Sequence, residues 1–226
     1  MKIELFDAYN IRARLSVTII LLSPVILSLF LCFQSAFTTL SSAVIILVLL
    51  AFANYLPVLQ RAAGEKKNTT PVYAAQYLLP TDNTFDSVTK ERYYKKLAEL
   101  DNVFSGLKDA NNPDLCANTT SAVSFLREKT RDCRLVLEEN IIYGFCKNLQ
   151  SAKPFGIAMC ILTDALLIIC AAIKCSSLSD MSLRLWFTLA VNFVILLFWV
   201  FFVKERNRDA AAKRYAKALI SAIDSL

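Results

Sequence analysis

One apolar stretch with a single acidic residue near its middle limits what this chain can fold into. Residues 154–173 read PFGIAMCILTDALLIICAAI, twenty residues in which Asp164 is the only charged side chain. As a helix, the stretch is about 30 Å long, which matches the hydrocarbon core of a bilayer. A carboxylate at that depth is costly, so by default it faces other helices or serves a function. The stretch therefore predicts a membrane-spanning helix.

Three further apolar runs have the length of a membrane-spanning helix. They cover residues 15–33, 40–59 and 185–203. With 56% hydrophobic residues in a length of 226, the chain is also too apolar for an ordinary soluble domain. We predict an all-α membrane protein with four transmembrane helices in two hairpins, residues 15–59 and 154–203, preceded by a polar lead, residues 1–14.

The section between the two hairpins has a different composition. Residues 60–153 contain 14 Lys and Arg and 12 Asp and Glu, which predicts a soluble domain. Apolar side chains recur at intervals of three and four over residues 86–107, and again from Thr119 or Thr120 to Leu149, which predicts two helices. We therefore predict a helical cytoplasmic domain at residues 60–153, inserted between the second and third spans, and a helical tail at residues 204–226.

Basic residues predict which side of the membrane each segment faces, because Lys and Arg are retained on the cytoplasmic side. The lead has three, residues 60–153 have 14 and the tail has six. The loop after the first span has none, and the loop after the third span has two, Lys174 and Arg184. This distribution predicts a multi-pass protein of the cell inner membrane, with both termini and the central domain in the cytoplasm.

Asp164 is the strongest candidate for a functional residue, and Asn192 is its predicted neighbour. The third and fourth spans are consecutive and antiparallel, so the two residues are expected at a similar depth. In one interpretation, Asp164 forms a hydrogen bond with Asn192 and stabilises the bundle. In the other, several copies of Asp164 surround the axis of an oligomer and form an acidic ring in a cation-conducting pore. The sequence leaves both open.

Pro154 and Gly156 lie where the central domain meets the third span. Proline removes a helical hydrogen bond, so the pair predicts a hinge or a kink within one long helix. Asn54 lies near the cytoplasmic end of the second span. There it would either line an inner vestibule of a pore or anchor the helix at the membrane interface.

The central domain carries a group of basic residues that are candidates for binding an anionic ligand or a protein partner. These are Arg127, Lys129, Arg131 and Arg134. The alternative is a solvated helix face with ion pairs four residues apart, such as Arg134 with Glu138. The chain has no histidine and no phosphate loop or dinucleotide motif. We therefore predict no catalytic residues, no cofactor, no metal site and no direct nucleic-acid binding.

Three short motifs resemble a known group of proteins. At FDAYNIRARL, SFLREKTRD and EENIIYGFCKNL, the chain resembles uncharacterised bacterial four-span membrane proteins, in which two spans precede a helical cytoplasmic domain and two follow it. This plan is also similar to that of four-transmembrane effectors of anti-phage defence systems, in which a cytoplasmic signal gates an oligomeric pore. The first resemblance implies the architecture, and the second implies a function by analogy only.

Together these features predict an oligomeric effector or channel-like protein of the bacterial inner membrane. Its cytoplasmic domain would sense a soluble protein partner or a small anionic ligand and perturb membrane permeability, as in anti-phage defence. The expected partners are the lipid bilayer and further copies of the chain, with a tetramer as one such assembly. The alternative function is a non-conducting membrane scaffold that recruits a soluble cytoplasmic partner.

Overall fold

The computed structural model describes residues 8–32, 73–174 and 182–226, together with Ala51 and Tyr55. Every regular element within these residues is a helix, and none of them forms a strand. The chain divides into two compact units. We name Met1–Lys67 with Gly144–Asn207 the apolar unit, and Asn68–Tyr143 with Arg208–Leu226 the polar unit. The long helix α7 (Arg134–Lys174) belongs to both.

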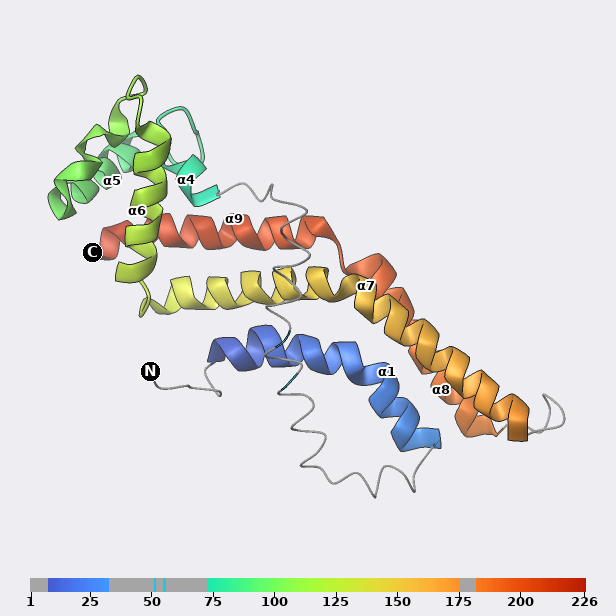
Figure 1. The fold of residues 1–226 in the computed structure, drawn as a ribbon. Coiled ribbons are helices and arrows are strands. Elements are labelled where there is room, and N and C mark those ends of the chain that lie inside the picture. Colours follow the sequence, from blue (N-terminus) through green and yellow to red (C-terminus); the bar gives the residue numbers. More distant parts are fainter. Residues whose placement is uncertain (1–7, 33–50, 52–54, 56–72, 175–181) are drawn as a thin grey trace. The chain divides into compact units, whose positions relative to one another are not determined.

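Within the described residues, three long helices are apolar. The first joins a π-helical turn, η1 (Asn10–Leu15), to α1 (Ser16–Cys32); the second is α7; the third joins α8 (Leu183–Leu197) to a π-helical turn, η4 (Phe198–Phe202) (Figure 1). Asn10–Cys32, Arg134–Ile173 and Leu183–Phe202 are each long and apolar enough to cross a membrane. They coincide with three of the four predicted spans. The predicted second span, residues 40–59, lies outside the described residues except for Ala51 and Tyr55, and Asn54 lies outside them too.

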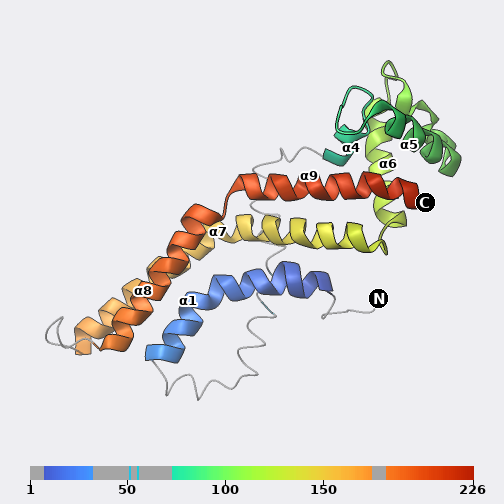
Figure 2. The ribbon, with the colours of Figure 1, turned by 180° about the vertical axis from the view of Figure 1, so that it is seen from behind.

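Helices α1 and α7 run in the same direction within the apolar unit, and α8 runs opposite to both (Figures 1 and 2). Near the start of α1, Asn148 of α7 donates from Nδ2 to the Ala13 carbonyl at 2.6 Å. Further along both helices, Ser28 of α1 and Asp164 of α7 accept from the same side chain, Asn192 of α8. The start of α1 therefore lies beside the middle of α7 and its end beside a later part of α7, so the two helices are parallel.

Among the described residues of the apolar unit, two prolines lie inside helices without ending them. Pro24 of α1 lacks the N–H that would bond the Ile20 carbonyl, and Ser23 Oγ donates to that carbonyl at 2.8 Å. Pro154 lies within α7, which is continuous through it. Figure 1 shows that α7 bends between its yellow first part and its orange second part. The boundary that we predicted between the central domain and the third span, between residues 153 and 154, therefore lies inside one bent helix.

The polar unit combines the central segment of the chain with its C-terminal end. Its elements are α4 (Tyr73–Tyr77), α5 (Ser87–Leu100), the 3₁₀ segment η2 (Asn102–Lys108), α6 (Leu115–Lys129), the first part of α7, most of α9 (Glu205–Ser221) and the 3₁₀ turn η5 (Ala222–Ser225). Leu97, Leu107 and Leu126 from the central segment are fully buried with Leu219 and Ile223 from the C-terminal end. The tail thus shares a hydrophobic core with the central segment.

The helix that we predicted over residues 86–107 is interrupted, so that prediction was wrong in part. Helix α5 ends at Leu100, and Asp101 adopts an extended conformation with φ −155° and ψ 124°. The Asp101 side chain accepts from the Val103 N–H at 3.0 Å and caps the 3₁₀ segment η2. Aspartate competes with helical hydrogen bonds in this way, and for that reason it favours caps over helix interiors.

The helix predicted from Thr119 or Thr120 to Leu149 was also wrong in its extent. Helix α6 ends at Lys129, a turn follows, and α7 begins at Arg134. At the end of α6, the Thr130 hydroxyl donates to the Leu126 carbonyl at 2.7 Å. The same carbonyl accepts from the Thr130 backbone N–H at 2.8 Å, so Thr130 bonds the last turn of α6 through both its backbone and its side chain.

A buried lysine and a buried tyrosine of α5 fix the loop that precedes this helix. Lys90 Nζ donates to the Leu79 carbonyl at 2.6 Å and to the Asp82 carbonyl, and Tyr94 Oη donates to the Leu78 carbonyl at 2.9 Å. Burial lowers the pKa of the Lys90 ammonium, and the Asp82 carboxylate opposes this shift. Burial raises the pKa of the Tyr94 hydroxyl to about 12, and nearby carboxylates add to the shift.

Candidate functional site

A polar cluster in the apolar unit is centred on Asn192, whose side chain is fully buried. Its Nδ2 donates to Asp164 Oδ1 at 2.8 Å and to Ser28 Oγ at 3.2 Å. Ser28 in turn donates to the Pro24 carbonyl at 2.6 Å. One amide group therefore joins α1, α7 and α8. Asp164 and Asn192, which we predicted to lie at a similar depth in the membrane, are in direct contact. Ser28 is a third member of the cluster, and the sequence did not indicate it as their partner.

The cluster is incompletely satisfied and incompletely covered. Among the described residues, Asn192 Oδ1 is a buried acceptor with no hydrogen-bond partner. Leaving such a group without a partner costs about 1–3 kcal/mol. Asp164 is only partly buried in the single chain. Asp164 thus takes part in the cluster and is also partly exposed.

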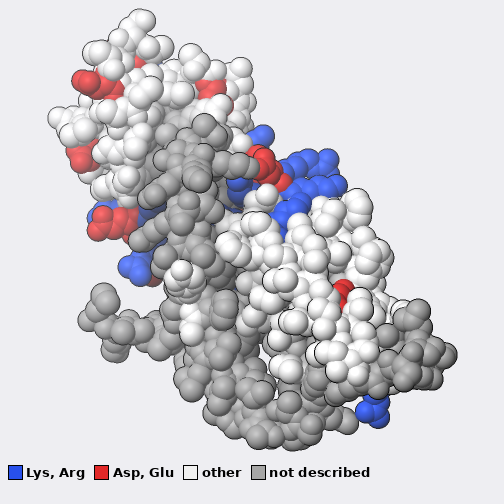
Figure 3. Space-filling model, turned by 45° about the vertical axis from the view of Figure 1, so that its right-hand side comes forward, with Lys and Arg blue, Asp and Glu red and all other residues white. Residues whose placement is uncertain are grey.

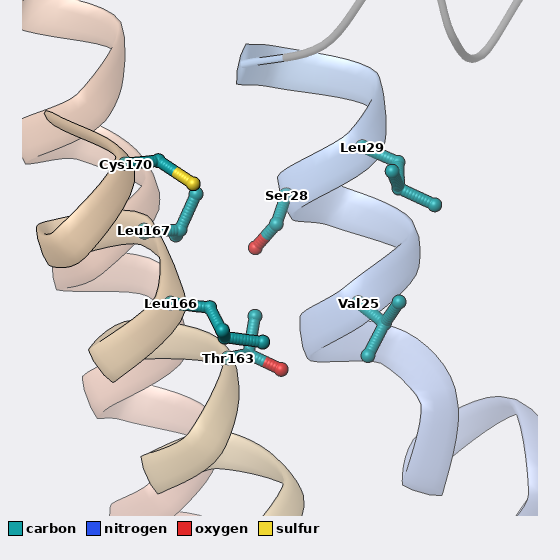
Figure 4. A pocket seen from close by; sticks show the side chains of 7 residues that line it. All are labelled: Val25, Ser28, Leu29, Thr163, Leu166, Leu167 and Cys170. Carbon is teal, nitrogen blue, oxygen red and sulfur yellow. The ribbon is translucent and has the colours of Figure 1, made fainter. Parts of the chain in front are cut away.

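A pocket of about 160 Å³ lies beside the cluster, between α1 and α7 (Figure 4). Ser28 belongs to both features, and Thr163 is the other hydroxyl in the wall. Figure 4 shows Ser28 directed from α1 towards α7. The remaining lining residues are Val25, Leu29, Leu166, Leu167 and Cys170. Because the wall carries no charge, the pocket suits an apolar group rather than an ion.

A second feature, which we name the joint, lies where η4 ends and consists of Lys153, Gly156, Trp199 and Val203. Lys153 Nζ of α7 donates to the carbonyls of Val200 at 3.1 Å and Val203 at 2.8 Å. The chain leaves the helical conformation at Val203, with φ −82° and ψ 94°, so these carbonyls lie at a helix C-terminus. A cation is favourable at that end. Lys153 of α7 therefore caps the end of the helix formed by α8 and η4.

Trp199 occupies the other side of the joint and is fully buried. A Cβ atom on Gly156 would overlap Cδ2 and Cε2 of the indole and would lie 2.6 Å from Cζ2. Gly156 therefore permits the close packing of η4 against α7. The sequence indicated Pro154 and Gly156 as a hinge, and the structure places Pro154 at the start of the joint and Gly156 within it. The role of Trp199 was missed, although a glycine in an apolar helix is a signal for a large neighbour.

The four basic residues of the predicted ligand-binding face lie around the turn between α6 and α7, and all are exposed: Arg127, Lys129, Arg131 and Arg134. Lys129 Nζ is 5.6 Å from the centre of the Phe125 ring. Arg134 Nε is 3.8 Å from Glu138 Oε1, which is the ion pair expected for a solvated helix face. Two of the four basic residues therefore have partners within the chain.

Comparisons of the chain with protein-family models, with curated proteins and with solved structures found no match. Within the described residues, no group of three or more His, Cys, Asp and Glu side chains could hold a metal ion. Among the described residues of the apolar unit, the polar cluster and the joint are two places where side chains from different helices form hydrogen bonds or close contacts.

Proposed function

We propose that the chain is a four-span protein of the bacterial inner membrane, with a helical cytoplasmic domain between its second and third spans. The parallel direction of α1 and α7 supports the second of these spans, residues 40–59, and with it a total of four. At Cys32 the chain is at the far end of the bundle, whereas Gly144 packs against Tyr9, the residue just before η1. The chain must therefore cross the apolar layer an odd number of times in between. Residues 40–59 are the one stretch of this interval with the necessary length and apolarity.

The charge distribution supports a cytoplasmic location for the end of the bundle where α1 begins. Arg12 and Arg14 lie there in η1, and the bond between Asn148 and Ala13 brings that part of α7 to the same end. Lys153 joins the end of η4 to this group through its bond to the Val203 carbonyl. Basic residues near span ends face the cytoplasm.

Cysteine labelling tests this topology. With the native cysteines replaced by serine, we expect Ser35→Cys to react with a membrane-impermeant maleimide in intact cells. Gly64→Cys should react only after the inner membrane is permeabilised. If Gly64→Cys reacts from outside, residues 40–59 do not cross the membrane.

We further propose that the protein is an oligomeric membrane effector or channel-like protein whose cytoplasmic domain acts on the spans. The observation that carries this proposal is the continuity of α7, which begins in the polar unit and ends as the span that contains Asp164. A continuous helix transmits a displacement of its cytoplasmic part to the bundle. The joint fastens the same helix to η4, a few residues before the chain re-enters the polar unit at Arg208. A role in anti-phage defence has the architectural analogy as its only support.

The partial exposure of Asp164 supports assembly of several copies. A carboxylate in contact with lipid is costly, and in spanning helices such groups face other helices or a water-filled cavity. Asn192 satisfies one carboxylate oxygen at 2.8 Å. A second copy of the chain, or a hydrated path between copies, would cover the exposed part of the group.

The effector proposal is tested by measuring membrane potential and dye entry in cells that express the chain. We expect wild type to depolarise the cells and Asp164→Asn, which keeps an acceptor for Asn192, to depolarise them much less at equal membrane levels. The matched control is Glu205→Gln, an exposed acid beyond the spans, which should behave as wild type. If wild type leaves the cells polarised, or if Asp164→Asn depolarises them fully, the proposal fails.

A non-conducting scaffold is the second candidate, and one observation favours it. Hydroxyl groups in the spans bond the carbonyls of their own helices: Thr18 bonds Arg14, Ser28 bonds Pro24 and Thr188 bonds Arg184. Such groups are not left free to line a hydrated path. A scaffold would leave cells polarised and would cross-link to one cytoplasmic protein through a photoreactive residue at position 131. Replacing Arg127, Lys129 and Arg134 by Gln should abolish that cross-link.

A further inference from the structure

The helix formed by α8 and η4 ends at a sharp boundary between apolar and basic side chains. Phe201 and Phe202 are 57% and 68% exposed, and they are the last large apolar residues of this helix. The chain leaves the helical conformation at Val203, and the exposed residues Lys204 and Arg206 follow at once. In a bilayer, the two phenylalanines would contact acyl chains, and the two basic residues would reach the level of the headgroups.

Further positive charge lies beside this boundary. Two hydrogen bonds to the Val200 and Val203 carbonyls hold the Lys153 ammonium next to Lys204. Figure 3 shows a group of Lys and Arg side chains that borders a broad surface almost free of charge. The charges of Lys153, Lys204 and Arg206 exceed that of Glu205, the acidic residue between the last two.

Lys204 and Arg206 are also accessible to a ligand. Both side chains are exposed, and neither forms an ion pair with a described residue. By contrast, Arg208 is engaged by Asp209, to which its Nη2 donates at 3.0 Å. The ammonium of Lys204 and the guanidinium of Arg206 can therefore donate to an external anion without breaking an existing bond.

We propose that Lys204 and Arg206, with Lys153 beside them, bind the headgroup phosphates of anionic phospholipids. A phosphodiester carries one negative charge and accepts from both ammonium and guanidinium groups, the latter in a two-pronged geometry. The exposed phenylalanines that precede the site favour a lipid over a free phosphate, because they add an apolar contact for the acyl chains. The proposal rests on membrane insertion of α8 and η4, and it does not depend on whether the protein conducts ions.

Lipid binding to the purified full chain in detergent tests the proposal by native mass spectrometry. We expect phosphatidylglycerol to bind more tightly than phosphatidylcholine. The double variant Lys204→Gln/Arg206→Gln should weaken phosphatidylglycerol binding about thirtyfold, because each basic residue near an anionic surface contributes about fivefold in affinity. The matched control, Lys213→Gln/Lys217→Gln, removes two exposed basic residues further along α9 and should bind as wild type.

Three results would overturn the proposal: equal affinity for the two lipids, equal weakening by the control variant, or full competition by inorganic phosphate at the concentration of the lipid. The last would indicate a site for a small anion. If the double variant does not fold, each single variant should bind about fivefold more weakly. Wild-type binding should also weaken between 50 and 500 mM salt because of screening, and binding that is independent of salt would contradict a headgroup site.

Discussion

The indole ring of Trp199 lies where a side chain on residue 156 would be, so Gly156 and Trp199 determine how closely η4 approaches α7. A Cβ atom at position 156 would overlap two atoms of the six-membered ring. The ring is fully buried and cannot move aside into solvent. Its Nε1 has no hydrogen-bond partner among the described residues, so packing alone keeps it in place.

This packing predicts that Gly156→Ala destabilises the apolar unit. Overpacking of a close contact costs roughly 1–3 kcal/mol, which outweighs the gain of about 1 kcal/mol in helix propensity from glycine to alanine. We expect a lower unfolding temperature for the full chain in detergent, measured by circular dichroism. Ala158→Val is the matched control, because Ala158 is exposed on the same helix. Equal unfolding temperatures for Gly156→Ala and wild type would contradict the role assigned to Gly156.

Lys153 caps the end of η4, and its removal should loosen that end. Lys153→Met keeps the apolar stem but leaves the Val200 and Val203 carbonyls without their charged donor. A hydrogen bond to a charged group contributes about 1.5–3 kcal/mol. We expect faster amide hydrogen exchange over residues 198–203. Lys147→Met, an exposed position on the same helix, should leave the exchange unchanged. Unchanged exchange in Lys153→Met would show that the cap has no effect on this turn.

The buried hydroxyl of Tyr94 predicts a loss of stability at high pH. Its pKa is about 12 in the folded chain, against an ordinary value of 10.0, so the folded state retains a proton that the unfolded state releases. The stabilisation is therefore complete below pH 10 and is lost as the pH rises towards 12. Over this range the free energy of unfolding should fall by roughly 2–3 kcal/mol.

Comparison of wild type with Tyr94→Phe isolates this effect from other alkaline effects. Wild type should be more stable at pH 8, because Tyr94 donates to the Leu78 carbonyl at 2.9 Å. The difference in the free energy of unfolding should shrink steadily between pH 10 and 12, since the phenylalanine variant has nothing to titrate there. A difference that stays constant over this range would contradict the assigned pKa.

Length and apolarity were sufficient to predict the three described helices that are long and apolar enough to cross a membrane. The similar depth of Asp164 and Asn192 in two consecutive antiparallel helices was sufficient to predict that they are neighbours. The third member of the cluster, Ser28, could not be predicted, because spacing along one helix does not show which other helix lies beside it. The same holds for Gly156 and Trp199, which are separated in sequence by the rest of α7 and the whole of α8 and meet only through packing.

In the polar unit, the helix ends could not be predicted from the hydrophobic pattern, because local side-chain hydrogen bonds determine them. The three- and four-residue periodicity continues past Asp101 and Thr130, and both residues end their helices by bonding nearby backbone groups. The hydrophobic pattern also could not predict that α9 packs into the core of the polar unit. Leu219 and Ile223 lie near one face of a charged helix, which fits a free amphipathic tail as well as an element of a shared core.

The bond between Asp164 and Asn192 should contribute measurably to stability if it holds the bundle together. A double-mutant cycle with Asp164→Ala and Asn192→Ala isolates the interaction from the effects of each substitution alone. Hydrogen bonds between membrane helices contribute about 0.6 kcal/mol on average and up to about 1.7 kcal/mol. We expect a coupling near the upper value, because Asn192 is fully buried and donates to two helices at once.

The control for this cycle pairs Asp164→Ala with Thr18→Val. Thr18 is equally buried but bonds the Arg14 carbonyl of its own helix, so no coupling with Asp164 is expected. The apparent free energy of unfolding in mixed micelles provides the measurement. No coupling between Asp164 and Asn192 would remove the stabilising role of this bond. If Asp164→Asn still abolished membrane depolarisation, Asp164 would then act mainly through contacts outside the single chain.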